Sequence, residues 1–150
     1  MIYNRTQNDI NEAKRIRKEK VQAFLELTSS DIETLERGTI TINTLNRICS
    51  KQEELKNLFS DMGYWNTPIT NKVWGKNDIF KVDELQRMLD NTNVLRNAFF
   101  VYNGTPNTPP VSYHYNDINA LEKILHDIDV MINDVKSNYR ECGAYECGEG

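Results

Sequence analysis

The side chains of this sequence with the greatest potential for catalysis or metal binding are two histidines and three cysteines. His114 and His126 do not show the H-E-x-x-H pattern or another metal-ligand spacing. Cys142 and Cys147 are five residues apart, and this spacing alone lacks the further ligands that a tetrahedral zinc site requires. Cys49 falls in a helical pattern, where we expect a small buried side chain. We therefore expect no metal site and no cofactor.

Other patterns that support catalysis are missing from the sequence. It has no glycine-rich phosphate-binding loop and no G-x-S-x-G motif. The carboxylate pairs Asp83/Glu84 and Glu53/Glu54 fall on helix faces that we expect to be exposed, where solvation accounts for them. We therefore predict no catalytic residue and a protein that is not an enzyme.

Charge and hydropathy narrow the range of partners. Eighteen basic and 22 acidic residues give the 150-residue chain a formal net charge of -4. A chain with this balance has no overall attraction to DNA or to an anionic membrane, so nucleic-acid binding would need a local basic patch. Apolar stretches such as 98–102 are too short to span a bilayer, and the first residues lack the apolar region of a secretory signal. We expect a protein made in a cytoplasm, with no membrane span.

Apolar residues recur at helical spacing in five segments, which are 6–24, 31–37, 43–63, 82–99 and 116–136. The connections include 64–80, which holds both tryptophans, and 103–110, whose three prolines exclude regular structure. We predict a mainly α fold, a small helical bundle of four to five helices with irregular connections, over residues 1–138. The β-branched stretch 39–42 is a candidate for a short strand.

The first helical segment has two contrasting faces. Thr6 and Asp9 approximate a capping box, so we expect the helix to start there. Its apolar stripe is Ile10, Ala13, Ile16, Val21 and Phe24. Its other face carries the basic cluster, which is Lys14, Arg15, Arg17, Lys18 and Lys20. This cluster is either a solvated face partly paired with carboxylates or a surface for nucleic acid or lipid headgroups.

The segments 43–63 and 116–136 resemble each other at an offset of about 73 residues. Apolar pairs such as Leu55 and Ile128 keep the same period in both. The matched Asn46 and Asn119 lie one residue past the start of each stripe, where a carboxamide can bond to backbone outside its helix. The similarity indicates either a pseudo-repeat, which we favour, or two amphipathic helices that share a period. We assign Glu122 to the polar face of the second of these helices.

Residues 139–150 form a separate C-terminal tail. The stretches 141–145 and 146–150 both begin Glu-Cys-Gly and are too small to form a core. The tail is either frayed or docked in extended form on a neighbour, where it would add a strand. The residues that we assign to an assembly interface in this tail are Tyr139, Gly143, Tyr145 and Gly148.

The chain resembles a known family in four short motifs and in its repetitive tail. The motifs lie in segments 3–9, 43–48, 83–89 and 115–124. It resembles minor structural proteins encoded in the tail-module regions of phages and prophages of Firmicutes. Members open with D/N-R-T-x-x-D, carry two L/A-N-R-I/V-E helix starts and close on a Y-S-G-E-x-Y-S-G-E-like tail. Ala120 stands where the second helix start usually has Arg, and Cys142 and Cys147 stand where the tail usually has Ser.

The resemblance implies a structural subunit of a phage tail, baseplate or tail-like contractile particle that acts in assembly or attachment of tail components. The expected partners are other tail or baseplate proteins and further copies of this chain, rather than nucleic acid, and the expected location is the virion or particle. The motif residues with structural roles would be Thr6, Asp9, Asn46, Arg47 and Asn119. The alternative function is a small regulatory or nucleic-acid-binding helical module that uses the basic cluster.

Overall fold

The computed structural model describes residues 1–64 and 68–144, with side chains described through residue 138. Its elements are α1 Gln7–Ile16, the π-helical turn η1 Arg17–Val21, α2 Ser29–Gly38, α3 Ile42–Asp61, α4 Val82–Asn97 and α5 Tyr115–Ala144. The described residues contain no strand, and the candidate strand 39–42 is instead the short link between α2 and α3, with Thr39 as the C-cap of α2 and Thr41 as the N-cap of α3. The predicted mainly α fold is confirmed.

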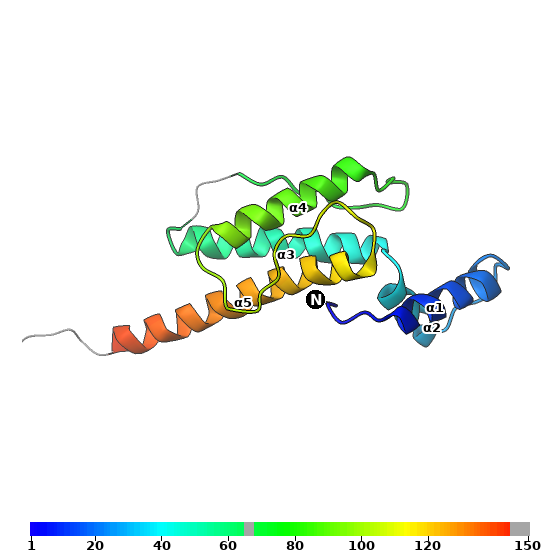
Figure 1. Ribbon diagram of the computed structural model, residues 1–150, viewed down its shortest axis with the longest axis horizontal. Helices are drawn as coiled ribbons and strands as arrows, with labels where there is room; N and C mark the ends of the chain where they lie inside the picture. Colours follow the sequence, from blue (N-terminus) through cyan, green and yellow to red (C-terminus); the bar gives the residue numbers. More distant parts are fainter. Residues whose placement is uncertain (65–67, 145–150) are drawn as a thin grey trace, which may run out of the picture.

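Three helices, α3, α4 and α5, form a bundle in which all three run in the same direction (Figure 1). Between α3 and α5, Arg47 pairs with Glu122 and Lys51 with Asp129, so the two helices advance along the bundle in the same sense. Helices that run in the same direction cannot be joined by tight turns, because each connection must return over the length of the bundle. The long connections 62–81 and 98–114, which hold all four prolines, make these returns.

The bundle core is built from the apolar stripes of the three helices. The α5 stripe predicted from the sequence is buried, with Leu121, Leu125, Ile128 and Ile132 at 0% exposure. Burial of side chains of this size contributes about 1.5–3 kcal/mol each. The other fully buried members of the core are Ile48, Leu55, Phe59, Leu85, Met88, Leu95, Ile124 and Met131.

Helices α1 and α2 form a hairpin beside the end of the bundle where α5 begins (Figure 1). Both helices start with a complete capping box, from Thr6 with Asp9 in α1 and from Thr28 with Asp31 in α2. Gly38 at the end of α2 lies directly against α1, and a Cβ there would overlap the carbonyl oxygen of Asp9. The hairpin therefore depends on a glycine for its close packing.

The prediction for the second half of the first helix was wrong. Ala13 and Ile16 are buried as expected, but Val21 is 40% exposed and Phe24 is 97% exposed. The π-helical turn η1 adds a residue to the helical turn, which rotates the following residues off the apolar stripe. Phe24 also has a φ of 55°, in the left-handed region that a bulky residue rarely occupies.

The other differences from the predicted elements concern helix ends. Helix α2 begins at Ser29, because Thr28 and not a later residue caps it. Phe99, the last residue of the predicted helical segment 82–99, lies past the end of α4 and is 37% exposed. Helix α5 continues to Ala144, so the predicted tail boundary at residue 139 falls within the helix, and the last six tail residues lie outside the described residues.

Candidate functional site

The N-terminal segment is held on α5 by Asn119. Its Oδ1 accepts hydrogen bonds from the backbone N–H and from Nη1 of Arg5, both at 3.2 Å, and its Nδ2 donates to the Arg5 carbonyl at 2.9 Å. One carboxamide thus satisfies both backbone groups of a single residue. We call this arrangement an asparagine clamp.

A second asparagine clamp holds the connection between α3 and α4. Asn46 accepts from the Trp74 N–H at 2.7 Å and donates to the Trp74 carbonyl at 3.0 Å. The Trp74 ring is 3% exposed and meets Phe80 edge to face, with Lys72 above it. Both asparagines therefore bond to backbone outside their own helices, at equivalent places in α3 and α5.

Glu122 is the centre of a buried ion triad. Its carboxylate is 0% exposed, and Oε1 lies 3.2 Å from Arg5 Nη2 and 2.7 Å from Arg47 Nη2. The other oxygen accepts the backbone N–H of Ile2. Burial lowers the pKa of the Arg5 guanidinium, and the attraction of Glu122 partly offsets that shift. The triad joins the N-terminal segment, α3 and α5.

The assignment of Glu122 to the polar face of the last helix was wrong. The residue lies between Leu121 and the buried Ile124, so it falls on the inner edge of the stripe. One signal in the sequence could have located it, because the offset of 73 residues aligns Glu122 with Cys49, which was expected to be buried and is 4% exposed.

Thr6 and Asp9 fix the start of α1 on the hairpin. The Asp9 carboxylate accepts the Thr6 N–H at 2.7 Å and lies 3.2 Å from Arg37 Nε on α2. The hydrogen bond from Arg37, followed by that from Thr6, holds the pKa of Asp9 below its ordinary value. The cap therefore also ties α1 to α2.

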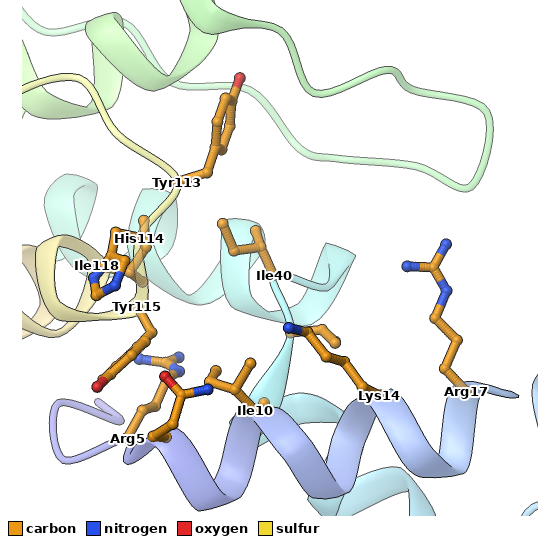
Figure 2. Close-up of a pocket in the computed structure, with 12 residues that line it drawn as sticks. Arg5, Ile10, Lys14, Arg17, Ile40, Tyr113, His114, Tyr115 and Ile118 are labelled. Carbon is orange, nitrogen blue, oxygen red and sulfur yellow. The ribbon is translucent and has the colours of Figure 1, made fainter.

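A cleft of about 470 Å³, which we call the N-terminal cleft, lies between α1, the link from α2 to α3, and the start of α5. Figure 2 shows Lys14 of α1 and Arg17 of η1 on the side where Ile40 lies, with Tyr113 and His114 on the opposite wall. The cleft combines cations with apolar and aromatic walls, so it suits a ligand that carries both anionic and apolar groups.

The basic cluster divides into paired and unpaired cations. Arg15 lies 3.0 Å from Glu12 and 2.8 Å from Glu19, and Lys20 lies 2.6 Å from Asp31. Lys14, Arg17 and Lys18 are exposed and form no ion pair with the described residues. Two of these three unpaired cations, Lys14 and Arg17, line the N-terminal cleft.

A second hollow of about 500 Å³ lies against α3 and the connection that follows it. Its charged side chains already have partners, since Glu53 lies 2.5 Å from Lys56 and Lys72 lies 3.4 Å from Asp78. It therefore offers fewer free groups to a ligand than the N-terminal cleft does.

The two histidines have different surroundings. His114 accepts the Asn116 N–H at 3.3 Å beside the N-terminal cleft, whereas His126 stacks on Tyr3 with ring centres 4.8 Å apart. Among the side chains described, those of residues 1–64 and 68–138, no three from histidine, cysteine or acidic residues are grouped as a metal site. Cys142 belongs to the last turns of α5, and Cys147 lies outside the described residues.

The predicted assembly residues fall at the end of the described chain. Tyr139 and Gly143 belong to the last turns of α5, and Tyr145 and Gly148 lie outside the described residues. These last turns of α5 extend past the ends of α3 and α4 (Figure 1).

No protein-family model matches this chain, and comparisons with curated proteins and with solved structures also give no match. Within the part of the chain that the structure describes, none of the helices has the length and apolar character needed to cross a membrane.

Proposed function

We propose that this protein is a structural subunit of a phage tail, baseplate or tail-like contractile particle, and that it acts in assembly or attachment of tail components. The motifs of the family resemblance support a structural role. Arg47 belongs to the ion triad, Asn46 and Asn119 form the clamps, and Thr6 and Asp9 cap α1. Each of these side chains is used to hold segments of the fold together.

The observation that carries the proposal is the C-terminal end of α5. Helix α5 has 30 residues against 16 in α4, and its last turns extend beyond the bundle (Figure 1). Residues 137 and 138, which follow the last core-packed residue Val135, are exposed. Because helices in proteins gain most of their stability from packing, a helix end that leaves its own bundle is suited to pack on a partner.

In this proposal the protein is made in the cytoplasm of a bacterial host and resides in the particle. Its neighbours are other tail or baseplate proteins and further copies of itself. Its role is to connect subunits, with no chemical step.

The experiment that tests the proposal is mass spectrometry of purified particles from cells that make the wild-type chain or a chain lacking residues 139–150. The wild-type protein should be present in the particles. The shortened chain should be lost from particles that otherwise assemble, since it lacks the end of α5 and the tail. Absence of the wild-type protein from all particle fractions would contradict the proposal.

A second function, nucleic-acid binding by the basic cluster, is favoured by the unpaired Lys14, Arg17 and Lys18. Binding of this kind weakens steeply as salt rises, because each neutralised phosphate releases counterions. Alanine variants at these three positions should abolish the binding of a duplex DNA or single-stranded RNA oligonucleotide. Wild-type protein that binds neither oligonucleotide at low salt would remove this function.

A further inference from the structure

Two neighbouring cations in the N-terminal cleft are free to bind an anionic ligand. Lys14 and Arg17 lie one helical turn apart, on the same face of the chain, and both line the cleft. Arg5 also lines it, but its charge is already shared with Glu122. The free positive charge of the cleft therefore comes from Lys14 and Arg17.

The walls of the cleft indicate what kind of anion fits. Ile10 and Ile40 supply apolar surface, and Tyr113, which is 48% exposed, supplies an aromatic ring. A free phosphate or another small anion would leave these apolar walls uncovered. A peptide with carboxylates, small residues and an aromatic side chain would use both the cations and the apolar walls.

The chain itself contains a peptide of this composition. Residues 141–150 carry Glu141, Glu146 and Glu149 with no lysine, arginine or histidine, and they include Tyr145 and three glycines. The segment is therefore opposite in charge to the cleft and contains an aromatic residue that could pack on its walls.

We propose that the N-terminal cleft binds the acidic segment 141–150 of a second copy of this chain. This inference rests on the proposed function, since it assumes a subunit that is present in multiple copies, and it assigns the contact between those copies. Glu146 and Glu149 pair with Lys14 and Arg17, and Tyr145 packs on the apolar walls.

The contact joins two copies because the cleft lies at the start of α5, whereas the acidic segment follows the end of α5. Tyr115 lines the cleft, and the 30 residues of α5 carry the chain about 45 Å away from it. The six residues that follow Ala144 can span at most about 21 Å. A chain cannot therefore place its own segment in its own cleft.

This contact uses different surfaces on the two copies, so it is head to tail. Contacts of this type build rings when the rotation between copies closes and open filaments when it does not. An association of this kind leaves a free cleft at one end of every open chain of subunits, ready for another copy.

The test is sedimentation velocity of the full-length protein over a range of concentrations, under reducing conditions so that Cys142 and Cys147 cannot link copies. The wild type should self-associate, more weakly as salt rises. The cleft variant Lys14→Glu/Arg17→Glu and the tail variant Glu146→Lys/Glu149→Lys should each lose self-association by about tenfold or more in Kd, because attraction becomes repulsion.

The decisive arm mixes the two variants. Each variant supplies the charge that the other lacks, so an equimolar mixture should regain the association that each has lost alone. The matched control is Lys18→Glu/Lys76→Glu, which makes the same change in net charge away from the cleft and should associate like the wild type. Circular dichroism of every variant checks that the fold is retained.

Several outcomes overturn the inference. The inference is wrong if the wild type is monomeric at all concentrations. It is also wrong if the cleft variant self-associates as strongly as the wild type. Oligonucleotide binding that depends on Lys14 and Arg17, without self-association, would assign the cleft to nucleic acid.

Failure of this inference can be told apart from failure of the proposed function. A protein that is found in particles but does not associate through the cleft retains the structural role and loses this contact. A protein that associates through the cleft but never enters particles retains the contact and loses the tail role.

Discussion

Replacing Glu122 by alanine is expected to have one of the largest effects on stability of any substitution in this fold. The change removes the carboxylate that Arg5 and Arg47 share. The Arg5 side chain is only 3% exposed, so its charge cannot return to water without unfolding the N-terminal segment. Its remaining partners are the neutral oxygens of Ile2 and Asn119.

The magnitude follows from the burial of both charges. Breaking a buried pair by removing one partner costs about 3–5 kcal/mol, because the other charge stays buried without compensation. The free energy of unfolding of a domain is about 5–15 kcal/mol in total, so Glu122→Ala should remove about a fifth or more of the stability. Arg47, whose side chain is 26% exposed, can reach water and adds less to the loss.

The assay is urea denaturation followed by far-ultraviolet circular dichroism, with extrapolation of the free energy of unfolding to water. The control is Glu12→Ala, which breaks an exposed pair with Arg15 and should cost at most about 1 kcal/mol. The apolar double variant Arg5→Met/Glu122→Leu should recover more than half of the loss, because no buried charge remains unpaired. If the free energy of unfolding of Glu122→Ala lies within about 1 kcal/mol of the wild-type value, the triad does not hold a buried charge in place as we infer.

Three further predictions concern the clamp and the hairpin. Asn119→Ala should lower the free energy of unfolding by about 1–3 kcal/mol in the same urea assay, because it leaves backbone groups of Arg5 unpaired; an effect below 0.5 kcal/mol would contradict this. Gly38→Ala should lower the melting temperature by about 2–8 °C, since the new methyl group pushes α1 away from α2. An unchanged melting temperature would show that α1 and α2 pack less closely than in this structure. The hydrogen bond from Lys20, with those from Thr28, lowers the pKa of Asp31 from 3.8 to about 2. A group with a depressed pKa stabilises the fold above its unfolded pKa and loses this contribution as the pH falls. The stability advantage of the wild type over Asp31→Asn should therefore be full above about pH 5 and shrink toward pH 2 in thermal melts; an advantage independent of pH would rule out this source.

The helices of the bundle could be predicted because their apolar residues repeat with the helical period. Leu85, Met88, Leu89 and Leu95 of α4 lie in the core, as that period predicts. The period carries no information on the direction in which one helix lies beside another. The common direction of α3, α4 and α5 therefore became visible only in three dimensions, where it explains the two long connections.

Two features escaped prediction for physical reasons. The burial of Glu122 depends on Arg5, which is 117 residues away in the sequence, and a local pattern cannot report such a distant partner. The π-helical turn depends on a single additional residue, and neither composition nor period marks its place. By contrast, the cap of α1 and the two clamp asparagines were accessible, because capping and side-chain bonds to backbone follow from residue type and position.

The two asparagine clamps also bear on the order in which the chain folds. Asn46 and Trp74 close a loop of 28 residues, whereas Asn119 and Arg5 close one of 114 residues. Since the entropy lost on closing a loop grows with the logarithm of its length, the second closure costs about 1.2 kcal/mol more. Loop entropy therefore favours closing the Asn46–Trp74 clamp first, and we expect the N-terminal segment to be secured later in folding. Arg5 of this segment lines the cleft, so we expect release of the segment to open the cleft while the bundle remains folded.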